Sequence, residues 1–267
     1  MTFFVINEVL LEKEGVDTMN EVIETILNHR SIRKFEERQL SSDQIKLIVK
    51  SAQAASTSSF IQAYSIIGVK NPDTKRRLAE LAGNQPYVAE NGHFFVFCAD
   101  LNRHDFIGKF ENKSLNLSLE STEKFMVSLI DAALAAQNAV LAAESMGLGA
   151  CYIGGLRNKL DEVSTLLKIP NHVIPLFGIA VGFPLQISDK KPRLPIEHIY
   201  HEEEYEQNID QFEQQLMEYN NIISSYYSGR TNGKRNDTWT GQMAKMLGNP
   251  TRTYMKEFVQ SKGFLKD

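Results

Sequence analysis

The longest helical pattern in the sequence, residues 121–146, places the strongest constraint on the fold. Its central stretch, Leu129–Val140, is rich in alanine, which favours a helix and lets a neighbouring element approach closely. The pattern is apolar around most of its circumference, so the helix is expected at the centre of a domain or in a subunit interface. Gly147 and Gly149 mark its end.

Shorter apolar patterns on both sides of this helix predict a mixed domain. Four strands are expected, over residues 63–69, 94–99, 150–153 and 173–181. The run at 94–99 is continuously apolar, as in a strand buried on both faces. Further helices are expected over residues 20–29, 72–81, 158–167 and 208–227, followed by two short helices. Another helix is expected to start at Ser41, which can form a capping box with Gln44. Strands interspersed with helices, without a βαβ glycine signature, predict an α+β domain.

Composition divides the chain into three parts. A clean helical pattern begins after Met19, so residues 1–18 are expected to be an extension that the fold does not need. Residues 19–195 carry the strands and are expected to form the core. Residues 196–267 are acidic and glutamine-rich and are expected to form a helical arm that wraps another surface, with a basic loop at Ser228–Arg235.

Charge and cysteine content exclude several classes of protein. The 267 residues have a net charge of -4, which argues against a general binder of nucleic acid or membrane surfaces. Cys98 and Cys151 lie singly in apolar runs and the histidines are scattered, which favours reduced thiols in a cytoplasmic protein and no metal site. No apolar run approaches the ~20 residues of a membrane span, and no signal peptide is evident.

Two basic clusters, residues 29–34 and 190–193, lie far apart in the chain. Because the sequence lacks the common phosphate-binding glycine loops, a bound phosphate would have to be held by cationic side chains. Arginine suits this task, since its planar group donates two aligned hydrogen bonds to phosphate oxygens. Either cluster alone is more often solvated surface. Together, in an acidic protein, they favour a small anionic ligand over a polymer.

Several segments, in this order and spacing, resemble the FMN-dependent nitroreductases, in particular the NADPH-preferring branch. The segments are His29–Arg33, Ser58–Gln62, the turn at Gln85, Ala136–Gly149, Tyr152–Asn158, Lys191–Pro195 and Asn236–Trp239. The resemblance covers about residues 19–267. It implies a nitroreductase-like fold, in which helices flank a central, mainly antiparallel sheet. It also implies a homodimer, with the C-terminal arm around the partner and the alanine-rich helix at the interface.

The resemblance further implies an FMN site whose phosphate end is held by side chains. Those side chains are expected to be Arg30, Ser31, Lys191 and Arg193. His29 is expected to face the ribityl chain or the phosphate rather than to donate a proton. Arg33 is expected near the pyrimidine edge of the flavin, where a positive charge stabilises the reduced ring.

At the ring itself, the resemblance places the backbone of Gly154 and Gly155 against flavin N5 and O4, where a side chain would block close approach. Tyr152 and Ile153 are expected to pack near the ring, and Thr57 and Gln85 to supply polar contacts. Without the resemblance, the glycine pair would be read as an ordinary turn.

Arg230 and Arg235, together with Arg33, match positions at which this branch binds NADPH, the first two in a mobile loop that contacts the 2′-phosphate. Taken alone, the loop would be a solvated charged segment. The implied reaction is a ping-pong transfer of hydride from NADPH to the flavin and then to nitroaromatics, quinones, free flavin or related acceptors. No catalytic side chain is then required. Two alternatives stay open: a flavin-binding electron carrier with little NADPH turnover, and a protein whose arm or residues 1–18 bind a regulatory partner.

Overall fold

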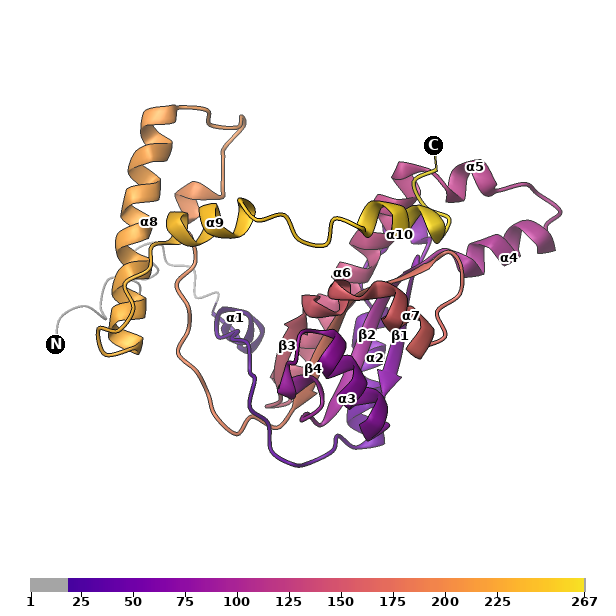
Figure 1. The fold of residues 1–267 in the computed structure, drawn as a ribbon, viewed down its shortest axis with the longest axis horizontal. Helices are drawn as coiled ribbons and strands as arrows, with labels where there is room; N and C mark the ends of the chain where they lie inside the picture. The colour runs from indigo at the N-terminus through magenta and orange to yellow at the C-terminus, as the bar shows by residue number, and fades with distance from the viewer. Residues whose placement is uncertain (1–18, 267) are drawn as a thin grey trace.

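A four-stranded antiparallel sheet forms the centre of the computed structural model, which describes residues 19–266 (Figure 1). The strands are β1 (Tyr64–Val69), β2 (His93–Asp100), β3 (Gly149–Ile153) and β4 (Val173–Gly182), in the order β1-β2-β4-β3. Every neighbouring pair is antiparallel. The α+β class and the antiparallel sheet flanked by helices are therefore confirmed. Residues 1–18, expected to be dispensable, lie outside the described residues.

The inner strand β2 is the continuously apolar run of the sequence. All eight of its residues are buried. Phe95 and Phe97 point into a cluster with the alanines of the long helix, whereas Phe94 and Val96 point into a cluster on the opposite face. Because successive side chains of a strand alternate between faces, burial on both sides requires apolar residues throughout.

Helices cover both faces of the sheet. On one face lie α2 (Ser42–Gln53), with its capping box formed by Ser41 and Gln44, and the long α6 (Thr122–Ser145). The inward face of α6 is lined with buried alanines, so α2 and the sheet can approach its backbone. On the other face lie α3 (Pro72–Leu81), the short helix η3 (Gly154–Asn158) and α7 (Leu160–Leu166).

By length and composition, α6 is the one helix among residues 19–266 that could cross a membrane, although 44% of its apolar window is buried inside the structure. No membrane-spanning segment was expected from the sequence. The difference arises because the many alanines raise mean hydropathy without forming an unbroken run of large apolar residues. The contacts of α6 with α2, β1, β2 and β3 are those of a central helix.

Two helices were not anticipated, α4 (Asn102–Phe110) and α5 (Asn116–Leu119). Neither begins with a side chain that caps its first turn, so the usual sequence signal for a helix start is absent. Three single helical turns were also not predicted, η1 (Ser58–Phe60), η2 (Pro86–Val88) and η4 (Ile196–His198). The first helix, α1 (Glu21–Leu27), was expected.

The C-terminal part first leaves the sheet domain and then returns to it (Figure 1). Helices α8 (Ile209–Arg230) and α9 (Trp239–Leu247) pack on each other away from the sheet. Trp239 of α9 lies edge-on to Tyr219 of α8, with ring centres 5.6 Å apart, and so joins the two helices of the arm. By contrast, α10 (Met255–Ser261) buries Phe258 and Val259 in the core.

Candidate functional site

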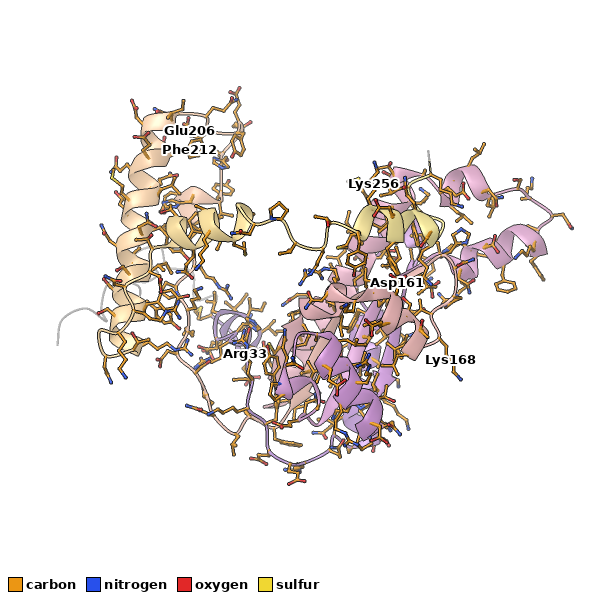
Figure 2. All side chains as sticks on the ribbon, viewed as in Figure 1. Arg33, Asp161, Lys168, Glu206, Phe212 and Lys256 are labelled. Carbon is orange, nitrogen blue, oxygen red and sulfur yellow. The ribbon has the colours of Figure 1, made fainter. Side chains whose placement is uncertain are left out.

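The two basic clusters of the sequence meet in one pocket, called here the basic pocket, with a volume of about 300 Å³. Its lining residues are His29, Arg30, Ser31, Arg33, Lys34, Gln186, Ser188, Asp189, Lys191, Arg193, Tyr226 and Arg230. They come from the segment after α1, the segment after β4 and the end of α8. Figure 2 shows Arg33 on the side of the core that faces the arm, with Lys168 on the opposite side.

The segment after α1 is held in an extended conformation beside the sheet. Ser31 pairs with Ala150 of β3 in a parallel bridge, and the Ile32 amide donates to the Ala150 carbonyl at 2.9 Å. Further along, Phe35 pairs with Pro184 just beyond β4. Ile32 and Phe35 are buried, which leaves Arg33 and Lys34 exposed. Local pairing with the sheet thus turns the cationic side chains outward.

The second cluster is held by contacts with α1 and the arm. Lys190 Nζ donates to Asn28 Oδ1 at 3.0 Å, and the Tyr219 hydroxyl of α8 donates to the Pro192 carbonyl at 3.0 Å. Lys191 Nζ lies 5.4 Å from the centre of the Tyr227 ring. A hydrogen bond to Lys191 lowers the pKa of the Tyr227 phenol below its ordinary value, because the ammonium stabilises the phenolate.

Positive charge dominates the basic pocket. Its cations are Arg30, Arg33, Lys34, Lys191, Arg193 and Arg230, and Asp189 is the single carboxylate in the lining. None of these cations forms an ion pair with a carboxylate among residues 19–266. His29 is already engaged, with Nδ1 at 2.7 Å from Glu144 Oε1. The pocket can therefore hold a doubly charged anion by side chains alone.

A second group of predicted site residues surrounds the glycine pair at the end of β3. A β-carbon on Gly155 would lie 2.3 Å from the Ala82 carbonyl oxygen and 2.8 Å from Gln85 Nε2. Gln85 Nε2 donates to that same carbonyl at 2.9 Å, and the Tyr87 hydroxyl donates to Gln85 Oε1 at 2.7 Å. The Arg33 guanidinium lies 5.9 Å from the centre of the Tyr87 ring. Arg33 of the basic pocket is therefore linked to the glycine pair through Tyr87 and Gln85.

The other predicted site residues, Tyr152, Ile153 and Thr57, lie in three different environments. Tyr152 is 37% exposed and donates to Gln137 Oε1 at 3.2 Å; burial raises the pKa of its phenol. Ile153 is only 1% exposed and lies in the core, so its side chain does not offer a surface for a ring, although its backbone continues beside Gly154. Thr57 precedes η1 and lines neither the basic pocket nor the contacts around Gln85.

The two arginines of the expected nucleotide loop are separated by the structure. Arg230 is the last residue of α8 rather than part of a loop, because the helix continues three residues beyond its predicted end. Arg230 lines the basic pocket and donates to the Tyr226 hydroxyl at 2.7 Å. Arg235 lies outside that lining, pairs with Asp237 at 2.7 Å and stacks 4.3 Å from the centre of the Tyr227 ring.

A buried carboxylate that the sequence analysis missed organises the loop between α2 and β1. Asp131 of α6 is fully buried and accepts hydrogen bonds from the Ser58 amide at 3.0 Å and the Ala63 amide at 2.9 Å. Between them, Ser59, Phe60 and Gln62 have φ of 48°, 58° and 54°, which is strained for residues other than glycine. One acidic residue within the alanine-rich helix was the available signal.

We expect Asp131→Asn to lower the free energy of unfolding by about 1 to 2 kcal/mol, because the amide can accept from only one of the two buried backbone groups. Urea unfolding followed by circular dichroism measures this change. Glu123→Gln, an exposed change in the first turn of the same helix, is the matched control. Equal stability of the two variants would show that Asp131 does not hold the loop.

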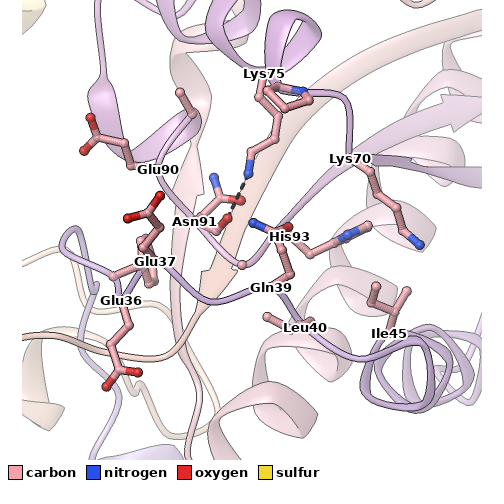
Figure 3. A pocket seen from close by; sticks show the side chains of 14 residues that line it. Glu36, Glu37, Gln39, Leu40, Ile45, Lys70, Lys75, Glu90, Asn91 and His93 are labelled. Carbon is pink, nitrogen blue, oxygen red and sulfur yellow. Dashed lines mark hydrogen bonds between the residues drawn. The ribbon is translucent and has the colours of Figure 1, made fainter.

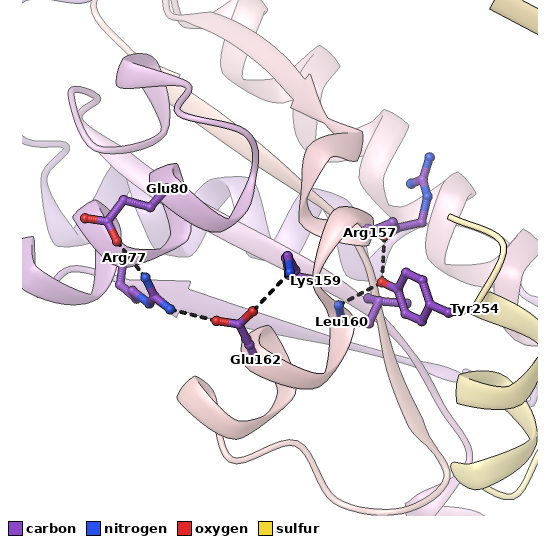
Figure 4. A network of polar contacts seen from close by, with 7 residues as sticks. All are labelled: Arg77, Glu80, Arg157, Lys159, Leu160, Glu162 and Tyr254. Atoms are coloured by element: carbon purple, nitrogen blue, oxygen red, sulfur yellow. Dashed lines mark hydrogen bonds and ion pairs between the residues drawn. The ribbon is translucent and has the colours of Figure 1, made fainter. Parts of the chain in front are cut away.

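The C-terminal return also supports the glycine pair (Figure 4). The Tyr254 hydroxyl donates to the Arg157 carbonyl at 2.8 Å and accepts from the Leu160 amide at 2.9 Å. On the same side, Arg77 contacts Glu80 and Glu162, each at 2.7 Å, and so joins α3 to α7. The turn that carries Gly154 and Gly155 is thus tied to the last helix of the chain.

The fold and the basic pocket define a class of protein, an antiparallel α+β domain with a pocket lined by cationic side chains beside its sheet. Residues 26–183 match the Nitroreductase family, and residues 191–267 match the Nitroreductase family, C-terminal domain. The chain belongs to the nitroreductase family.

Similar proteins span nearly the whole chain. An FMN reductase (NADPH) of Bacillus subtilis is 58% identical over 93% of this chain and 100% of its own length. The structure of NfrA1 from B. megaterium is 71% identical, with a TM-score of 0.92 over 92% of this chain and 100% of that one. An NADPH:FMN oxidoreductase from Vibrio harveyi, complexed with NAD+, is 37% identical, with a TM-score of 0.81 over 93% of this chain and 100% of that one.

Proposed function

We propose that this protein is an NADPH-dependent FMN oxidoreductase. The observation that carries the proposal is the convergence of two distant basic clusters on one pocket, which Arg33 links to the glycine pair. The similarity to the FMN reductase of B. subtilis and the NADPH:FMN oxidoreductase of V. harveyi supports the choice of FMN and NADPH over other phosphorylated ligands.

The residues around the basic pocket fit FMN. A phosphate monoester carries about -1.5 to -2 charges near neutral pH and suits the cations of the lining, which have no carboxylate partner among residues 19–266. Arg30, Ser31, Lys191 and Arg193 would hold the phosphate, and His29, oriented by Glu144, would lie beside the ribityl chain. The pocket volume of about 300 Å³ suits this end of the cofactor and leaves the ring outside it.

The ring would lie towards the glycine pair. The backbones of Ile153, Gly154 and Gly155 would line one edge, Tyr152 would pack beside it, and Gln85 would supply a polar contact. Arg33 would place its charge near the pyrimidine edge. Bound FMN would supply the redox chemistry, by taking hydride from NADPH and passing it to an acceptor such as a nitroaromatic, a quinone or free flavin. The protein would contribute binding, orientation and charge.

A homodimer is part of the proposal. Large apolar side chains are exposed on three helices of the single chain. They include Val22, Ile26 and Leu27 of α1, Met126, Ile130 and Leu134 of α6, and Ile209 and Met217 of α8. An exposed apolar surface of this extent is typical of a subunit interface. The arm formed by α8 and α9 would wrap around a second subunit. The polar contact of Thr57 with the flavin stays a prediction. A cytoplasmic location also stays a prediction, consistent with two free, buried cysteines.

The test is the visible absorption spectrum of the purified protein during anaerobic addition of NADPH and, separately, NADH. Prompt bleaching of flavin bands by NADPH, with recovery on addition of a quinone, is expected. A flavin-loaded protein that NADPH does not bleach would favour the electron carrier. A protein that takes up no FMN would overturn the proposal.

For the nucleotide, we expect Arg230→Ala to raise the apparent KM for NADPH about threefold to fivefold and to leave the KM for NADH unchanged, because only NADPH carries a 2′-phosphate. Initial rates with a quinone acceptor measure both constants. Lys256→Ala is the control, since Lys256 is exposed on α10 and does not line the basic pocket. Equal losses with the two nucleotides would mean that Arg230 does not read the 2′-phosphate.

A further inference from the structure

A second pocket, larger than the basic pocket and sharing none of its lining, opens where β1 leads into α3 (Figure 3). Its volume is about 880 Å³. It is lined by the segment 35–40, by Ile45 of α2, by the start of α3 and by residues 89–93 before and in β2. We call it the Lys75 pocket.

Three buried polar side chains form the floor of the Lys75 pocket. Lys75, Asn91 and His93 are 4%, 4% and 3% exposed, respectively. Asn91 Oδ1 and His93 Nε2 are buried without a hydrogen-bond partner among residues 19–266. Lys75 Nζ donates one hydrogen bond, to the Asn91 carbonyl at 2.8 Å, and keeps further N–H groups to donate. Buried polar atoms are rarely left unpaired, so this floor is suited to a polar ligand.

The floor of the pocket places an uncharged imidazole, that of His93, beside a hydrogen-bond donor, Lys75. Burial, together with the charges of Lys70 and Lys75, lowers the pKa of His93 to about 4. Near pH 7 the ring is therefore uncharged and can donate or accept one hydrogen bond through Nε2. Burial also lowers the pKa of Lys75. An acceptor group of the ligand next to Lys75, such as a carboxylate, would offset that effect.

Opposite charges line the opening without pairing. Figure 3 shows Glu36, Glu37 and Glu90 on one side and Lys70 on the other, with Lys75 and Asn91 between them. None of these five charged residues forms an ion pair within the part of the chain that the structure describes. A ligand with a single charge would match one side and be repelled by the other. A ligand with both charges would match both.

We propose that the Lys75 pocket binds a small dipolar molecule that carries both an ammonium and a carboxylate group, as amino acids do. The carboxylate lies towards Lys75 and Lys70, and the ammonium donates to Asn91 Oδ1 and faces Glu90. This site is separate from the proposed flavin site and does not depend on the identity of the redox cofactor.

Isothermal titration calorimetry of the full-length protein tests the proposal with three dipolar probes: glycine, 4-aminobutanoate and 6-aminohexanoate. Hexylamine and hexanoate are single-charge controls. At least one dipolar probe is expected to bind about tenfold more tightly than either control. Added FMN is expected not to displace it. Absence of binding by all three probes, equal binding of a control, or displacement by FMN would each overturn the proposal.

Variants locate the bound probe. Glu90→Gln and Lys70→Gln change exposed side chains and are expected to weaken binding about twofold to fivefold without affecting the fold. Lys75→Met removes the buried donor and is expected to weaken binding about tenfold. Lys46→Gln, an exposed change on α2 outside the pocket lining, is the control. If Glu90→Gln and Lys70→Gln bind the probe as the control does, the probe lies elsewhere and the assignment is wrong.

Discussion

Gly155→Ala is expected to lower the free energy of unfolding by about 3 kcal/mol and to weaken FMN binding in parallel. The added β-carbon would lie 2.3 Å from the carbonyl oxygen of Ala82, which is backbone and cannot rotate away. Forcing an extra methyl group into a packed site of this kind costs about 1 to 3 kcal/mol, and a rigid neighbour puts the cost at the upper end. The displaced turn would also move Gln85, whose amide lies 2.8 Å from the same position.

Urea unfolding and FMN titration of the same samples measure both effects. Gly229→Ala is the matched control, because Gly229 lies within α8 with open space at the β-carbon position, and alanine favours a helix. Gly154→Ala is expected to be milder, since its nearest neighbour at 3.1 Å is the flexible tip of Arg157. Wild-type stability in Gly155→Ala would contradict the close packing at this turn.

Arg193→Ala is expected to weaken FMN binding about tenfold to hundredfold, which corresponds to one lost hydrogen bond between charged groups. Arg193 lines the basic pocket and has no carboxylate partner among residues 19–266, so it is available to a phosphate. Fluorescence titration of the apoprotein with FMN measures the change. A higher salt concentration is expected to reduce the difference in FMN affinity between the variant and the wild type, because salt screens partly exposed charges.

Arg76→Ala serves as the control for this measurement. Arg76 is an exposed arginine of α3 that pairs with Asp73 and lies outside the basic pocket. Its loss removes the same charge from the protein without touching the proposed phosphate site. If Arg193→Ala folds normally and binds FMN with unchanged affinity, the phosphate is held by other residues and the assignment of the pocket must be revised.

Local patterns in the sequence were sufficient to predict the strands and most of the helices. The capping box at Ser41 and the all-apolar run of β2 are signals that residues close in the chain carry by themselves. Helices α4 and α5 were missed because they lack capping side chains. The end of α8 was placed too early because Gly229 indicated a break, yet the helix continues through it to Arg230.

The candidate site was predictable as a set of residues but not as an arrangement. The sequence indicated that two basic clusters would hold a phosphate, and the resemblance to the nitroreductases named the glycine pair and Gln85. It could not show that Ile153 turns its side chain into the core, since one residue of register along β3 decides which face a side chain takes. Nor could it show that Arg235 is engaged by Asp237.

The sequence by itself determined the fold class, the elements and the residue types able to hold an anionic cofactor, because those properties depend on local spacing and composition. Only the tertiary structure decided which charges remain unpaired, which buried atoms lack partners and which distant segments meet. Lys75, Asn91 and His93 illustrate the difference. They belong to α3, the segment before β2 and β2 itself, and they share one pocket because the sheet and its helices pack in three dimensions.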